Sequence, residues 1–215
     1  MFTRRHLDQL VLDVEFVLLA VVQGVALTAL GIEAVPVLRH PDPTSCVMIA
    51  TGLLFVLAFW AGALIHAVSI VRWPMDLPHY FFYFAIGLLE MVTFAQTHHP
   101  SAWFAASLAF YLVGGALYAY DLAMIRHRRA AFDVNAPGRR LYAHVLARQQ
   151  LEMFVIMPAG LLFNLIAWWT LRSREELALG FPIAQLTFTT VFMVSLVRSF
   201  SQRMRLISAC MEEDG

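Results

Sequence analysis

The chain has 215 residues, of which 60% are hydrophobic and 14% are charged, and its formal net charge is zero. A soluble domain is about 45–50% apolar and about 25% charged, and a small one needs that charge to cover its surface. The composition and a mean hydropathy of +0.68 therefore exclude a soluble protein and predict an integral membrane protein. The zero net charge also excludes a global field that would recruit nucleic acid.

Six windows are long and apolar enough to span a bilayer, which takes about 20 residues at 1.5 Å rise each. They are residues 9–32, 47–71, 79–97, 101–125, 144–171 and 180–200. Proline-rich or polar turns separate them, and the longest is a basic loop at 126–143. The predicted fold class is all-α: residues 1–215 form a single polytopic transmembrane domain, a bundle of six helices.

The arginines are distributed unevenly over the connections. With the N-terminus in the cytoplasm, twelve of the fifteen fall in cytoplasmic segments, and only Arg39, Arg172 and Arg174 fall outside. Cytoplasmic loops are enriched in arginine and lysine, so both termini are predicted to be cytoplasmic. The complete absence of lysine is typical of a GC-rich genome and favours a multi-pass protein of a bacterial inner membrane.

Ionisable residues inside spans are costly and mark interior or functional positions. An inner polar layer is predicted near the cytoplasmic ends of four helices: Asp13 and Glu15, His66, Asp121, and His144 with Arg148 and Glu152. One interpretation is a salt-bridge network of Arg148, Asp13, Asp121 and His66 that stabilises the bundle. The other is a vestibule for a proton, an ion or a substrate.

A second, thinner polar layer is predicted near the outer side. It contains Glu90 with Gln96, Asn164, and Gln185 with three threonines. No basic side chain lies at the level of Glu90. This carboxyl group is therefore expected to be protonated, to be paired across a subunit interface, or to line water.

One face of the first helix is polar at its inner end and small further out. At 100° per residue, a stripe falls within about 60° of the Asp13 direction; it comprises His6, Gln9, Asp13, Val17, Ala20, Gly24, Thr28 and Gly31. Small residues allow close packing of helices, and the same stripe could line a narrow pore with an apolar constriction at Val17 or Leu27. In the fifth window, Pro158 and Gly160 predict a kink.

The sequence lacks the motifs of several kinds of catalytic or cofactor site. The histidines do not have the spacing of a zinc site, and only His66 and His144 are candidates for haem ligation. There is no phosphate-binding glycine loop and no serine nucleophile motif, so no enzyme activity, metal or cofactor is predicted. The basic loop and the Arg198–Arg205 end are either ordinary cytoplasmic flanks or attract anionic headgroups. They and the C-terminal tail are also places for a cytoplasmic protein partner.

The pattern of spans resembles the endosomal/lysosomal potassium-channel family and its bacterial six-helix relatives. The family's helix 1 signature is Arg-x-x-x-Phe-Ser-Asp, and Leu7 to Asp13 keeps its aspartate; Trp60 and His66 are similar in kind to a cluster on the family's second helix. The rhythm of Leu77 to Arg126, notably Ala116-Leu-Tyr-Ala-Tyr-Asp121, is also similar. The resemblance implies a tetramer with helix 1 lining an axial pore, with roles for Asp13 and His66.

These patterns lead to two functional hypotheses. The first is a homo-oligomeric, tetrameric ion-conducting pore, which could serve as a membrane effector that a partner or ligand triggers. The second is a non-conducting membrane subunit or anchor of a larger redox or enzyme complex.

Overall fold

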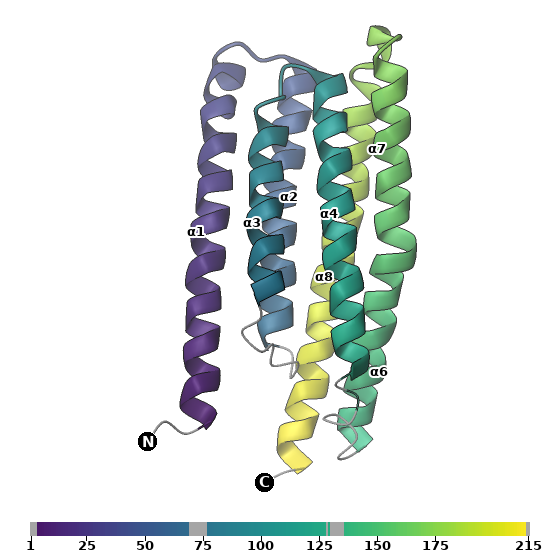
Figure 1. Cartoon of the computed structure of the whole chain (residues 1–215). Helices are drawn as coiled ribbons and strands as arrows, with labels where there is room; N and C mark the ends of the chain where they lie inside the picture. The colour runs from purple at the N-terminus through teal and green to yellow at the C-terminus, as the bar shows by residue number, and fades with distance from the viewer. Residues whose placement is uncertain (1–3, 69–76, 128, 130–135, 214–215) are drawn as a thin grey trace.

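Long antiparallel helices make up the structure, a computed structural model (Figure 1). It describes residues 4–68, 77–127, 129 and 136–213, and the side chains of these except at 4–12, 15, 66–68, 77, 136–137, 175 and 210–213. The elements are α1 (Arg4–Arg39), α2 (Pro43–Val68), α3 (Leu77–Phe94), α4 (Pro100–His127), α6 (Ala136–Leu151), the π-helical turn η1 (Glu152–Ile156), α7 (Met157–Leu171), the 3₁₀ turn η2 (Glu175–Leu177) and α8 (Gly180–Glu213). The described residues contain no strand, so the all-α prediction is confirmed.

Five segments are long and apolar enough to cross a membrane. They are Phe16–Arg39, Pro43–Ile65, Pro100–His127, Gly138–Leu171 and Gly180–Ala209. Large apolar side chains cover much of the outer surface; Trp169 is 69% exposed and Phe81 67%. The chain is therefore a multi-pass membrane protein, because only a lipid environment makes so much exposed apolar surface stable. The remaining predicted span, residues 79–97, corresponds to α3. This helix is 18 residues long and is not among the five.

The helices extend beyond the predicted windows at most of their ends, because the windows follow hydropathy whereas helices continue into the polar flanks. One such difference concerns the predicted basic loop at 126–143. α4 continues to His127 and α6 already begins at Ala136, so Arg139 and Arg140 lie on a helix. Of the rest of that loop, residues 128 and 130–135 lie outside the described residues.

The bundle is held together by a large apolar and aromatic core. α1 packs against α2 and α3, α4 packs against α3 and α7, and α8 packs against α2 and α6. The central cluster includes Met48, Phe94, Trp103 and Phe104, all fully buried. In Figure 1 the start of α1 and the end of α8 lie at the same end of the bundle.

The fifth window folds as one long helix with a π-helical turn where a kink was predicted. Pro158 has no N–H, and its ring would meet the carbonyl of the residue four positions earlier in a regular helix. The π-helical turn immediately precedes it, and the Met157 N–H donates to the Glu152 carbonyl. Two residues later, Gly160 lies against the ring of Tyr111 on α4. This glycine therefore sets how closely α4 and α7 approach.

We expect Gly160→Ala to destabilise the protein by about 1–3 kcal/mol, the usual cost of overpacking a core. A Cβ atom at residue 160 would overlap the ring of Tyr111, so the ring or the helix has to move. The midpoint of thermal unfolding in detergent measures the effect. Gly115→Ala on α4 is the matched control, because a Cβ atom there has no neighbour within 4 Å; an equal response of the two variants would contradict close packing at Gly160.

The turn between α1 and α2 ends in a helix cap. Oδ2 of Asp42 accepts a hydrogen bond of 2.8 Å from the backbone N–H of Ser45, and Pro43 occupies the first helical position, which is a favourable arrangement. The hydroxyl of Ser45 lies 3.3 Å from the carbonyl of Thr97 and 3.5 Å from Nδ1 of His98, so the cap also joins the neighbouring turn. Hydrogen bonds from the backbone and then the side chain of Ser45 lower the pKa of Asp42.

We expect Asp42→Ala to lower the stability by about 1 kcal/mol at pH 7, the usual value of such a cap. The carboxylate's stabilisation is present above its ordinary pKa of 3.8 and is lost as the pH falls through the lower value in the folded state. Thermal unfolding at pH 7 and pH 3 measures both effects. Asp42→Asn keeps an acceptor at the cap, so it should lose less stability at pH 7; a difference between wild type and Asp42→Ala that does not shrink on acidification would contradict the assignment.

Candidate functional site

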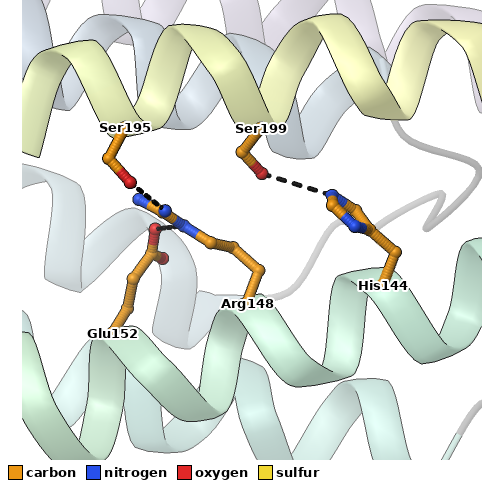
Figure 2. A network of polar contacts seen from close by, with 5 residues as sticks. All are labelled: His144, Arg148, Glu152, Ser195 and Ser199. Carbon is orange, nitrogen blue, oxygen red and sulfur yellow. Dashed lines mark hydrogen bonds and ion pairs between the residues drawn. The ribbon is translucent and has the colours of Figure 1, made fainter.

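A buried ionic cluster joins α6 and η1 to α8 near the end of the bundle that holds both termini. Arg148 donates from Nε to the carboxylate of Glu152 and from Nη1 to the hydroxyl of Ser195, each at 2.5 Å (Figure 2). One helical turn earlier, Nε2 of His144 lies 3.4 Å from the hydroxyl of Ser199. Both members of the ion pair are buried, with 8% of Arg148 and 3% of Glu152 exposed.

Two further residues extend this cluster towards the interior. Tyr118 on α4 lies within electrostatic range of Glu152, Arg148 and Arg203, and Gln149 donates to its backbone carbonyl at 3.0 Å. Arg203 on α8 is also buried. Nη2 of Arg148 and both Nε and Nη1 of Arg203 are buried without a hydrogen-bond partner among the described residues. The cluster therefore holds two guanidinium groups against the one carboxylate of Glu152.

A separate polar pair connects α3 to α4. Nε2 of His79 lies 2.8 Å from Oδ1 of Asp121, and both residues are buried. The ring of Tyr120 packs edge-on against the His79 ring, with centroids 5.1 Å apart. Asp121 is also within electrostatic range of Tyr118, so this pair lies next to the ionic cluster.

The predicted inner network of Arg148, Asp13, Asp121 and His66 is therefore wrong in its partners. Arg148 pairs with Glu152, one turn along its own helix, and Asp121 pairs with His79. Asp13 lies on an exposed face of α1, which packs against α2 and α3 and not against the cluster. The side chain of His66 lies outside the described ones. The prediction missed Arg203 as a buried residue because hydropathy placed it beyond the membrane.

The outer layer is also divided. Glu90 on α3, fully buried, accepts a hydrogen bond of 3.0 Å from Nε2 of Gln23 on α1. The sequence correctly indicated that Glu90 has no cationic partner at its level within the described part of the chain. It did not indicate the neutral partner Gln23, which lies outside the stripe of α1 that contains Asp13. Oε1 of each residue is buried without a hydrogen-bond partner among the described residues.

The predicted outer residues Asn164 and Gln185 do lie together. Trp103 of α4 donates through Nε1 to Oε1 of Gln185 at 2.8 Å, and Nε2 of Gln185 donates to Oδ1 of Asn164 at 2.9 Å. Asn164 in turn donates to the carbonyl of Gly160 at 2.7 Å. This neutral chain links α4, α8 and α7. Trp103 was not predicted because a tryptophan in an apolar window counts as a hydrophobic residue, and the sequence does not show which acceptor its indole N–H will reach.

The predicted pore stripe lies on an unpacked side of α1, which we call the open face. It consists of Asp13, Val17, Ala20, Gly24, Leu27, Thr28 and Gly31, all exposed. A Cβ atom built at Gly24 or Gly31 has no neighbour within 4 Å, and Thr28 donates only to the Gly24 carbonyl of its own helix. Within one copy of the chain, these small residues therefore do not serve helix packing.

The described residues contain no group of three or more His, Cys, Asp or Glu side chains able to hold a metal ion. No protein-family model, no curated protein and no solved structure matches the chain. The class that the fold and the sites define is an all-helical, multi-pass membrane protein, and arguments about its function rest on geometry.

We expect Glu152→Gln to destabilise the protein by about 3–5 kcal/mol, because it leaves Arg148 and Arg203 as buried cations without a carboxylate. Thermal unfolding in detergent measures the loss, with Glu176→Gln in the exposed η2 turn as the control. The double variant Arg148→Met/Glu152→Leu should recover part of the loss, because only Arg203 then remains uncompensated. If Glu152→Gln left the thermal stability unchanged, the pair would not be holding α6 against α8.

Proposed function

We propose that the chain is the protomer of a homo-oligomeric ion-conducting pore, with the open face of α1 directed towards the pore axis. The observation that carries the proposal is the character of this face. The exposed face of η1 and α7 bears large apolar residues such as Phe154, Leu162 and Trp169, which suit lipid. Apart from Val17 and Leu27, the open face of α1 instead bears alanine, glycine, threonine and aspartate, which suit close approach of a second copy or contact with water.

The topology of this pore has six spans and cytoplasmic termini. α3 supplies the sixth span: its 18 residues rise about 27 Å, close to the hydrocarbon thickness of about 30 Å. The arginine distribution directs both termini to the cytoplasm, and the membrane is a bacterial inner membrane. The resemblance to the potassium-channel family favours four copies and potassium as the conducted ion.

The open face provides the two elements of a gated cation pore. Val17 is 64% exposed and Leu27 47%, and rings of these side chains about 15 Å apart along the axis would form apolar narrowings that close by dewetting. Asp13 lies one turn before Val17, towards the cytoplasmic end. Its side chain makes no hydrogen bond or ion pair with a described residue, so a ring of these carboxylates is free to attract cations.

A pore this small has no sensing domain among its described residues, so its trigger is external. A protein or ligand that acts on the basic segment around Arg126 to Arg140 or on the cytoplasmic end of α8 would suit a membrane effector that depolarises the cell.

We expect Val17→Ser to raise potassium flux through proteoliposomes by about tenfold or more, because a hydroxyl wets an apolar narrowing. A potassium-sensitive dye measures the flux. Leu162→Ser on the lipid face of α7 is the control for a general loss of bilayer integrity, since Leu162 is similarly exposed. In the Val17→Ser background, Asp13→Asn should lower the preference for potassium over chloride without lowering the thermal stability.

The mass of the detergent-solubilised protein and its visible absorbance separate the two hypotheses. A symmetric homo-oligomer without visible absorbance, together with the Val17→Ser flux, supports the pore. A monomer, an obligatory second protein or a haem band would instead assign the open face of α1 to another subunit of a redox or enzyme complex, and the pore proposal would be abandoned.

A further inference from the structure

A lateral groove with a volume of about 570 Å³ runs between α6 and α8, on the outer side of the ionic cluster. α1 packs against α2 and α3, so this groove is separate from the open face of α1. Its walls change in character along α8. Towards the middle of the bundle they are apolar, with Leu151, Val191 and Val194, whereas towards the end of the bundle with both termini they present His144, Arg198 and Gln202.

This gradient matches the shape of a phospholipid. Val191 and Arg198 are seven residues apart, which places them about 10 Å apart along the helix axis. The apolar part of the groove can therefore receive an acyl chain while the polar end lies at the depth of the headgroup. All three apolar residues are exposed, so no described residue covers this part of the groove.

The polar end has donors for a phosphate and an excess of positive charge. Arg198 is exposed and makes no ion pair with a described residue, and a guanidinium group matches the oxygens of a phosphate. Ser199 and Gln202 follow on the same side of α8 and line the groove with it. Behind them lie the buried guanidinium groups of Arg148, which pairs with Glu152, and of Arg203. Nη2 of Arg148 and both Nε and Nη1 of Arg203 have no partner among the described residues. An anion at Arg198 therefore meets a net cationic wall.

We propose that this groove binds one anionic phospholipid, with its phosphodiester at Arg198 and an acyl chain along Leu151 and Val194. Lipid is favoured over a free phosphate because the groove opens sideways among exposed apolar side chains, where lipid is the solvent. An anionic headgroup is favoured over a choline headgroup because a quaternary ammonium group would lie beside these guanidinium groups. The inference does not depend on conduction.

The test uses the full chain in detergent, titrated with phosphatidylglycerol, phosphatidylcholine or inorganic phosphate, and native mass spectrometry counts the bound molecules. We expect phosphatidylglycerol to bind more tightly than phosphatidylcholine. Arg198→Gln should weaken phosphatidylglycerol binding about fivefold, the value of one interfacial arginine for an anionic lipid. Arg205→Gln is the matched control, because Arg205 is an exposed arginine of the same helix that does not line the groove.

A second variant tests the acyl part without changing charge. Val194→Trp fills the apolar part of the groove from an exposed position, so it should abolish tight phosphatidylglycerol binding while leaving the thermal stability without added lipid unchanged. Equal effects of Arg198→Gln and Arg205→Gln would reduce the observation to general attraction of the basic interface and overturn the site. Equal binding of both lipids, or binding of inorganic phosphate as tight as that of phosphatidylglycerol, would also overturn the proposal.

Discussion

Lipid offers no hydrogen bonds, so each polar side chain within the membrane has to find its partner inside the protein. In this chain, that constraint produces a series of polar links that each join different helices. Gln23 and Glu90 join α1 to α3, and His79 and Asp121 join α3 to α4. The Trp103, Gln185 and Asn164 chain joins α4 to α8 and α7, and Arg148 with Ser195 joins α6 to α8. Among helices that are apolar almost all round, these links fix rotation and register, which apolar packing alone specifies poorly.

The sequence predicted the helices well because a span is defined by hydropathy, which is a local property. It also grouped Asn164 with Gln185 correctly, because both lie near the same ends of adjacent spans. It failed where the partner depends on how a helix is rotated: the exposed Asp13 was expected beside Asp121, whereas His79 holds that position. The depth of a residue can be counted along the chain, but its direction cannot when the helix is apolar on every side.

The two edges of the bundle, at α1 and at α6–α8, expose side chains of different kinds. At the α1 edge, the open face carries small and polar side chains together with the exposed Val17 and Leu27, and open space remains around Gly24 and Gly31. At the α6–α8 edge, the exposed side chains change from apolar to cationic over two helical turns. The proposed pore uses the first edge to meet a second copy of the chain, and the proposed lipid lies at the second. In an assembly centred on α1, the α6–α8 edge remains available to the bilayer.

One proline accounts for the alignment of the inner cluster with the outer network. Arg148 and Asn164 are 16 residues apart, so on an unbroken α-helix they would point about 160° away from each other. The π-helical turn at Glu152–Ile156 adds about one residue to the helix, which reduces this angle to about 60°. Both side chains can therefore reach α8, where they meet Ser195 and Gln185. Because the carbonyl that Pro158 would obstruct in a regular helix, at residue 154, lies within this turn, the proline sets the rotation of α6 relative to α7. Arg148, with Glu152 one turn along the helix, and Asn164 thereby face the same helix, α8.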